Sequence, residues 1–160
     1  MTDRALPESH RAAVLRLADD LAETSIPWAL TGSASFVLQG VPLTPGDVDV
    51  QTDRGGARAI ADRFADAVAE PVTPTESERM RSVYGALTLG DVRVEIMGAV
   101  QKRREDGSWE DPVDVTDHRR FVTVDGRRIP VLSLEYEATA YERLGRAERA
   151  ALLRSYAAES

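Results

Sequence analysis

The chain contains no cysteine, which excludes disulfide bonds, zinc–thiolate sites and a thiol nucleophile from its 160 residues. Lysine is nearly absent too: Lys102 is the single lysine among 20 basic residues, so positive charge comes almost wholly from arginine. No apolar run approaches the roughly 20 residues that a membrane helix needs. The N-terminal residues 1–8 lack the apolar centre of a secretion signal. We therefore expect a cytoplasmic protein with no membrane partner.

The charge balance also limits the partners. The sequence has 27 acidic and 20 basic side chains, a formal net charge of −7. Non-specific binding to nucleic acid or to anionic lipid needs a basic field, which this composition does not supply. The length fits one folded domain, 1–160, and no linker, repeat or low-complexity segment divides it.

Hydrophobic periodicity predicts helices that alternate with strands. The predicted helices span residues 8–23, 34–39 and 55–69, followed by a C-terminal helical region over 133–158. The predicted strands span residues 28–31, 47–51, 83–89, 92–97, 121–124 and 127–132. This order predicts an α/β (α+β) domain in which helices flank a mixed β-sheet.

Glycine and proline mark the connections between these elements. Gly90-Asp91 and Asp125-Gly126 are typical of hairpin turns, and Pro71 and Pro74 indicate a loop. Residues 101–118 are polar and irregular, with Trp109 as an anchor. Ser133 can cap the C-terminal helical region, which we expect to break or bend at Gly145 and to continue to about Ala158.

Asp47 and Asp49 form the first part of a candidate site. On a strand, residues two apart point to the same side, so both carboxylates share one face while Val48 and Val50 face a core. Neighbouring carboxylates repel each other unless a cation lies between them, and oxygen ligands favour Mg²⁺ or Mn²⁺. Glu95 completes a cluster of three carboxylates if its strand lies beside that of the aspartates.

Gly32 and Ser33 form the second part, between a strand and the start of a helix. Glycine lets a ligand approach the backbone closely, and the N–H groups at a helix start attract phosphate. The Ser33 hydroxyl adds a further donor. Together, the two parts suit a metal-bound polyphosphate.

Less specific interpretations exist for each part. Pairs of aspartates two residues apart are often only solvated, and Gly-Ser is common in ordinary turns. A calcium-binding loop beginning at Asp47 needs glycine at its sixth position and glutamate at its twelfth. Thr52 and Arg58 stand there, so we reject that loop. The joint pattern of Gly-Ser, paired aspartates and a later glutamate favours a site.

Several stretches resemble one family along almost the whole chain, from about Trp28 to Leu153. They are Thr31 to Ser33, Phe36 to Pro42, Asp47 to Asp53, Val94 to Gly98, Trp109 to Asp114, Ile129 to Glu137, and Leu144 to Arg146. The sequence resembles the polymerase-β-like nucleotidyltransferase superfamily, and within it the small stand-alone prokaryotic nucleotidyltransferase-domain proteins. The spacing from Gly32 to Asp47 is similar to that of the lincosamide and aminoglycoside nucleotidyltransferases.

This resemblance implies a role for each site residue. Gly32 and Ser33 would hold nucleotide phosphates, and Asp47 and Asp49 would hold two metal ions. Glu95 matches the third carboxylate, which is often aspartate in the superfamily; glutamate is longer by one methylene group. The implied fold is a nucleotidyltransferase-type mixed sheet with a short C-terminal helical cover over 133–158.

The resemblance also implies a reaction. An acceptor hydroxyl would attack the α-phosphorus of a nucleoside triphosphate, expected to be ATP, and release pyrophosphate with the help of Mg²⁺ or Mn²⁺. Glu95 would bind the acceptor-side metal and could receive the proton. Arg79, Arg81 and Arg146 are candidates for contacts with phosphate, although surface charge explains each more readily.

The acceptor is left open by the sequence, as a small molecule or a macromolecule. The short C-terminal region leaves little of this chain to hold it, so a second copy or a partner chain could complete the cleft. The alternative function is a non-catalytic or antitoxin-like nucleotide-binding module that acts through a protein partner. The three carboxylates favour the enzyme.

Overall fold

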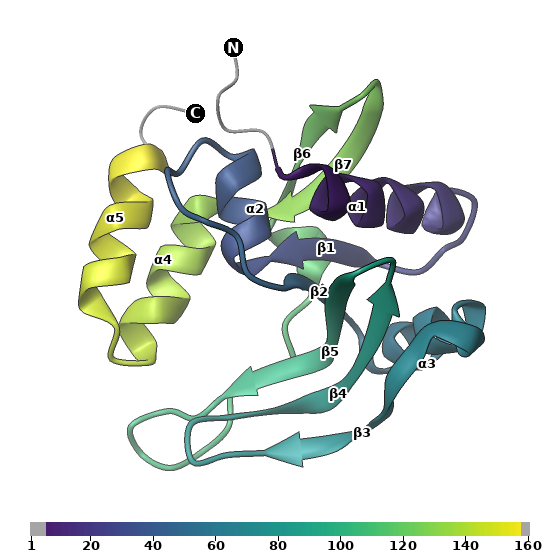
Figure 1. Cartoon of the computed structure of the whole chain (residues 1–160). Coiled ribbons are helices and arrows are strands. Elements are labelled where there is room, and N and C mark those ends of the chain that lie inside the picture. Colours follow the sequence, from purple (N-terminus) through teal and green to yellow (C-terminus); the bar gives the residue numbers. More distant parts are fainter. Residues whose placement is uncertain (1–5, 158–160) are drawn as a thin grey trace.

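The computed structural model describes residues 6–157, which build a seven-stranded mixed sheet in the order β3-β4-β5-β2-β1-β7-β6 (Figure 1). The strands are β1 (Trp28–Thr31), β2 (Val48–Thr52), β3 (Val68–Glu76), β4 (Met80–Leu89), β5 (Val92–Lys102), β6 (Arg119–Val124) and β7 (Arg127–Leu132). The predicted mixed sheet is therefore confirmed. Among residues 6–157, no helix combines the length and the apolarity needed to cross a bilayer.

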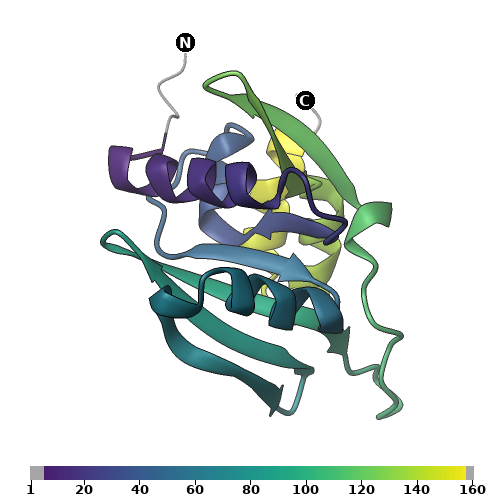
Figure 2. The ribbon, with the colours of Figure 1, turned by 90° about the vertical axis from the view of Figure 1, so that its right-hand side faces the viewer.

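Helices lie on both faces of this sheet. They are α1 (Glu8–Leu21), α2 (Gly32–Leu38), α3 (Arg54–Arg63), α4 (Leu134–Arg143) and α5 (Ala147–Ala157), with short 3₁₀ turns η1 (Ala65–Ala67) and η2 (Val115–Asp117). In Figure 2, α1 and α3 lie in front of the sheet, and the yellow C-terminal helices lie behind it. The two faces of the sheet therefore have different surroundings.

The face toward α1 and α3 carries the main core. Val48 and Val50 of β2 and Val94 and Ile96 of β5 are fully buried in it, as the alternation in the sequence predicts. On the other side, Phe36 of α2 packs in a second cluster with apolar residues of α4 and α5. The polar residues that alternate with the valines are thus directed to the side of the C-terminal helices.

The predicted loop at Pro71 and Pro74 is wrong, because both prolines lie inside β3. This strand forms one edge of the sheet. At an edge, a proline nitrogen can face solvent, so its missing N–H group removes no hydrogen bond from the sheet. Its pairing with β4 shifts register twice between Val68 and Thr73. The predicted helix over 55–69 is also too long, since α3 ends at Arg63.

The other elements lie close to their predicted positions. Both hairpins form, and Ser133 caps α4 by accepting a hydrogen bond from the Tyr136 N–H. The break at Gly145 separates α4 from α5, while the predicted end at Ala158 lies outside the described residues. The strand β5 continues to Lys102, into the segment predicted to be irregular, past a left-handed backbone conformation at Ala99.

Phe36 and Phe121 test which contacts hold the C-terminal helices in place. Phe36 is fully buried and meets the Tyr141 ring edge to face, whereas Phe121 is 40% exposed. We expect Phe36→Ala to lower the free energy of unfolding by about 3–5 kcal/mol, because it leaves a cavity between α2 and the helices α4 and α5. Phe121→Ala should cost less than about 1 kcal/mol. Urea denaturation followed by circular dichroism measures both, and equal losses would contradict this account of the second core.

Candidate active site

One row of residues crosses the sheet on the side of the C-terminal helices. Asp49 of β2 lies directly opposite Glu95 of β5, Glu95 is opposite Ala86 of β4, and Ala86 is opposite Glu70 of β3. On its other side, Asp49 is opposite Thr31 of β1. Directly paired residues project from the same face of a sheet. The structure therefore brings Asp49 and Glu95 together, as their spacing predicted.

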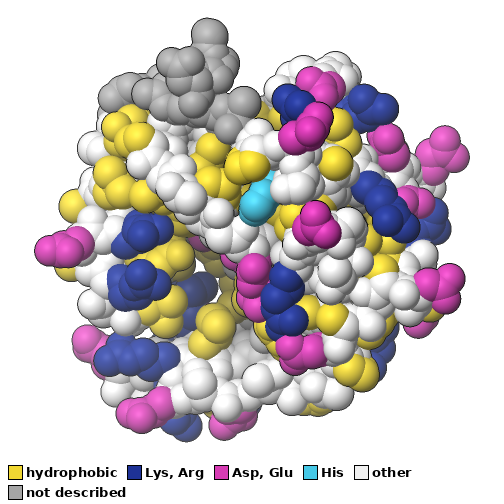
Figure 3. All heavy atoms as spheres, in the orientation of Figure 1, with side chains coloured by type: hydrophobic (Ala, Val, Ile, Leu, Met, Phe, Trp, Pro, Cys, Tyr) yellow, Lys and Arg dark blue, Asp and Glu magenta, His cyan; other side chains and the backbone are white. Residues whose placement is uncertain are grey.

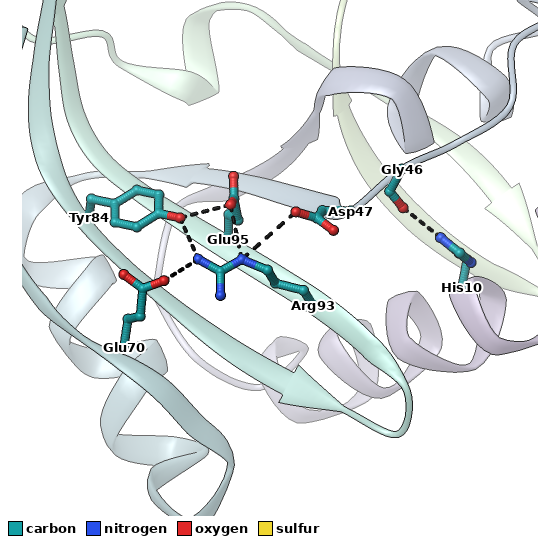
Figure 4. A network of polar contacts seen from close by, with 7 residues as sticks. All are labelled: His10, Gly46, Asp47, Glu70, Tyr84, Arg93 and Glu95. Carbon is teal, nitrogen blue, oxygen red and sulfur yellow. Dashed lines mark hydrogen bonds and ion pairs between the residues drawn. The ribbon is translucent and has the colours of Figure 1, made fainter.

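Arg93 supplies the cation that this row needs. It projects from the same face as Glu95, two residues away, and its Nε lies 3.1 Å from Glu95 Oε2 and 3.8 Å from Asp47 Oδ2 (Figure 4). Its Nη2 also contacts the Glu70 carboxylate. Hydrogen bonds to Glu70, Tyr84 and Glu95 raise the pKa of Arg93, so it stays cationic. The sequence placed Arg93 beside Glu95 but gave it no role.

Tyr84 is a second residue without a predicted role. Its hydroxyl donates a hydrogen bond of 2.7 Å to Glu95 Oε2 and accepts one of 2.8 Å from Arg93 Nη2. Burial and the hydrogen bond to Glu95 raise the pKa of Tyr84, which keeps the hydroxyl protonated as a donor. Figure 4 shows the Tyr84 hydroxyl directed toward Glu95 and Arg93.

Asp49 lies close to the negative charges of Glu95 and Asp47. Burial, together with the negative charges of Glu95 and Asp47, raises the pKa of Asp49 to about 7. Among residues 6–157, no ion pair joins Asp49 to a basic side chain, and Arg93 contacts Asp47 and Glu95 instead. The environment therefore favours a positive charge next to Asp49.

Gly32 allows the next element to approach Asp49. It is the first residue of α2 and has a positive φ of 73°, which favours glycine. A Cβ atom at this position would overlap Asp49 Oδ2. The sequence predicted glycine here for the close approach of a phosphate, whereas the structure shows the α2 backbone in direct contact with Asp49.

Glu137 of α4 lies behind this turn. Its side chain is 4% exposed, and its Oε2 accepts hydrogen bonds from Thr31 Oγ1 at 2.6 Å and from the Gly32 N–H at 3.3 Å. Burial raises the pKa of Glu137 to about 7. No role was predicted for Glu137 from the sequence, although an acid next to Ala138, in the apolar stripe of a helix, is a signal that could have found it.

Ser33 makes a hydrogen bond within the protein. Its Oγ accepts a hydrogen bond of 2.9 Å from the Gly46 N–H, and His10 Nε2 donates one of 2.6 Å to the Gly46 carbonyl (Figure 4 shows the His10 bond). These contacts fix the turn that precedes Asp47. The hydroxyl proton of Ser33 can still be donated to a ligand.

Gln51 adds an unexpected polar group. It lies two residues after Asp49 on the same face of β2 and is 8% exposed. Within residues 6–157, its Oε1 has no hydrogen-bond partner. A buried carbonyl oxygen left without a donor is costly, which makes a ligand donor at this position favourable.

The three arginines considered for phosphate contacts lie in different surroundings. Arg81 stacks 4.5 Å from the Trp109 ring centre and donates to Gln101, a structural role. The Arg79 carbonyl accepts from the Arg103 N–H. Arg146 lies over the Tyr141 ring, and burial together with the negative charges of Glu137 and Asp49 raises the pKa of Tyr141. Arg146 is therefore the candidate with a link to the site.

Hard divalent cations prefer oxygen ligands, and the carboxylates of Asp47, Asp49 and Glu95 offer them. In the part of the chain that the structure describes, no group of three or more acidic or histidine side chains is arranged to hold a metal ion. Asp47 and Glu95 are instead both in contact with Arg93.

A cavity of about 650 Å³ lies on the other flank of α4. It is lined on one side by Tyr136, Thr139 and Arg143 of α4 and on the other by residues of the 110–118 segment, with Lys102 between them. The whole face is hollowed between the C-terminal helices and the strands β3 to β5, and basic side chains gather on the helical side of this hollow (Figure 3). The lining of the 650 Å³ cavity includes none of the carboxylates Asp47, Asp49 and Glu95.

Comparison with known proteins identifies relatives along nearly the full chain. The family model for aminoglycoside-2''-adenylyltransferase matches residues 13–157. The crystal structure of a candidate nucleotidyltransferase from Thermotoga maritima is similar, with 43% sequence identity, a TM-score of 0.86, and coverage of 98% of this chain and 97% of that chain. No functionally curated protein matches the chain.

More distant structures share the fold. The lincomycin-bound lincosamide antibiotic adenylyltransferase LnuA is 15% identical with a TM-score of 0.59, over 94% of this chain and 98% of that one. ANT(2'')-Ia in complex with adenylyl-2''-tobramycin is 13% identical with a TM-score of 0.50, over 93% and 97%. At these identities, the likeness concerns the fold alone.

Glu137 gives a prediction for the pH dependence of stability. An acid whose pKa is raised by folding holds its proton more tightly in the folded state. Its contribution to stability is therefore full below the ordinary pKa of 4.5 and is lost as the pH rises through about 7. Between pH 5 and pH 8, we expect the wild type to lose about 2–3 kcal/mol more unfolding free energy than Glu137→Gln does.

Urea denaturation at the two pH values measures this difference. Glu135→Gln is the matched control, because Glu135 lies on the same helix but is exposed. It should follow the wild type. Identical pH dependence in the wild type and in Glu137→Gln would refute the buried, proton-binding state of Glu137.

Proposed function

Because the chain belongs to the aminoglycoside-2''-adenylyltransferase family, a family of nucleotidyltransferases, we propose that it transfers a nucleoside monophosphate from a nucleoside triphosphate to an acceptor hydroxyl. Pyrophosphate is the second product, and ATP is the proposed donor. The single observation that carries the assignment to a site is the row in which Asp49 lies opposite Glu95 and against Gly32. Membership of an enzyme family favours this function over the non-catalytic binding module.

The carboxylates are the proposed metal ligands. Asp47, Asp49 and Glu95 would bind Mg²⁺ or Mn²⁺, an assignment supported by their oxygen donors and by the raised pKa of Asp49. When bound, the cation would stabilise negative charge on the reacting phosphate and make the acceptor hydroxyl easier to deprotonate. Glu95 is proposed to orient the acceptor hydroxyl and to receive its proton.

The α2 turn is the proposed phosphate site. Gly32 has no side chain, so the α2 turn lies directly against Asp49, and a phosphate bound to the N–H groups of this turn would lie next to the carboxylates. The Ser33 hydroxyl can donate a hydrogen bond while its oxygen accepts from Gly46. Arg146, over Tyr141, is the proposed source of positive charge near the phosphates.

The cavity beside α4 is the proposed acceptor site. Carboxylates outnumber cations in its lining, with Lys102 and Arg143 as the basic members. The acidic members are Glu110, Asp111, Asp114, Asp117 and Glu135. This charge suits an acceptor that carries both amines and hydroxyls, and tobramycin, the compound adenylylated in the ANT(2'')-Ia complex, is of that type. The same helix α4 links this cavity to Glu137 and the Gly32 turn.

Asp49→Asn tests the proposed site. The amide keeps the shape of the side chain but removes the charge that a cation needs, so we expect nucleotidyl transfer to fall more than about 100-fold. Stability should be unchanged or raised, because the substitution relieves repulsion from Glu95 and Asp47. The assay follows radiolabel from ATP with Mg²⁺, using tobramycin, lincomycin and a cell extract as acceptor sources.

Asp62→Asn is the control for this experiment. Asp62 is exposed on α3, which lies on the opposite face of the sheet, so this variant should keep the wild-type rate. Transfer at the wild-type rate by Asp49→Asn would show that the reaction does not take place at this row.

A further inference from the structure

We propose that Tyr84 and the Glu70–Arg93 ion pair are positioning residues that fix the orientation of the Glu95 carboxylate for nucleotidyl transfer. This inference rests on the proposed function, and it concerns residues that neither the sequence pattern nor the family match assigns. The sheet leaves a gap between the side chains of Glu70 and Glu95.

Ala86 creates this gap. It lies opposite Glu95 on one side and opposite Glu70 on the other, in the same row of the sheet. Its methyl group is too short to fill the space above β4 between the two longer acidic side chains. Tyr84 and Arg93 enter this space from either side of the row and meet each other there, with their hydrogen bond of 2.8 Å.

Both residues hold the same oxygen atom. The Tyr84 hydroxyl donates to Glu95 Oε2 at 2.7 Å, and Arg93 Nε donates to Glu95 Oε2 at 3.1 Å. Two donors on one carboxylate oxygen fix the rotation of the whole group. The second oxygen, Oε1, is thereby left for Asp49 or for a ligand, on the side away from Tyr84.

Glu70 fixes Arg93 in turn. Its carboxylate contacts Arg93 Nη2, the same nitrogen that donates to Tyr84. Glu70 lies on the edge strand β3 and makes no contact with Asp49 or Asp47 among the interactions of the described residues. Its effect on the site can therefore pass only through Arg93. Partners of this kind behind a metal-binding carboxylate typically change affinity or activity by about 10–100-fold when they are removed.

Two variants separate positioning from a structural role. Tyr84→Phe removes one hydroxyl and leaves the ring in place, and Glu70→Gln weakens the hold on Arg93 from the edge strand. We expect each to lower kcat by about 10-fold while KM for ATP changes less than about twofold, because the phosphate site at Gly32 and Ser33 is untouched. Thermal unfolding midpoints should stay near that of the wild type.

The matched controls make the same two substitutions, Glu to Gln and Tyr to Phe, at positions away from Glu95. Glu76→Gln changes an exposed acid on the same strand as Glu70, and Tyr156→Phe removes a hydroxyl from α5. Both should keep the wild-type kcat. A wild-type kcat in both Tyr84→Phe and Glu70→Gln, or an equal fall in the controls, would overturn the inference.

A second readout does not depend on catalysis. Calorimetric titration with Mn²⁺ alone should show affinity about 10-fold weaker in Tyr84→Phe than in the wild type, and unchanged affinity in Tyr156→Phe. If the wild type binds Mn²⁺ but transfers no nucleotide, the proposed function fails while this titration still decides the role of Tyr84. If the wild type transfers nucleotide and Tyr84→Phe matches it in both kcat and Mn²⁺ affinity, the positioning role fails and the function stands. If the wild type neither binds Mn²⁺ nor transfers nucleotide, both fail.

Discussion

Repulsion between carboxylates placed in one row of a β-sheet is the constraint on which the site depends. Parallel pairing of β2 with β5 puts Asp49 opposite Glu95, and the pKa of Asp49 rises to about 7 as burial and these neighbours act on it. Arg93 neutralises part of the charge from the Glu95 side, and Tyr84 holds the same oxygen. Arg93 thus offsets only part of the negative charge, and a second cation near Asp49 would be favourable. This is the place proposed for the metal.

The same constraint explains the elements around the row. The turn into α2 needs glycine at position 32, because any larger residue would overlap Asp49. Glu137 reaches from α4 to the Gly32 N–H and to Thr31, so the C-terminal helices are tied to the turn by a buried carboxyl group. Packing of Phe36 beneath α4 and α5 holds these contacts together. The helical cover is therefore part of the site.

The sequence predicted much of this arrangement, because its signals are local. Alternation of Val48 and Val50 with Asp49 was enough to set the faces of β2, whereas Asp47, predicted to lie on the same strand, lies just before its first residue. Edge strand β3 was missed, since prolines normally argue against a strand and only its place at the edge permits them. The roles of Arg93 and Tyr84 depend on which strands are neighbours, and no local pattern carries that information; Glu137 has only the local signal of an acid next to apolar helix residues.

The most direct test of the central claim is a crystal structure of the wild type with Mn²⁺ and a non-hydrolysable ATP analogue. Anomalous scattering locates the manganese without reference to the protein side chains. The account predicts a manganese peak bound by Asp47 and Asp49, with phosphates against the Gly32 turn. Manganese and phosphates bound away from this row, with Arg93 still joining Asp47 to Glu95, would contradict it.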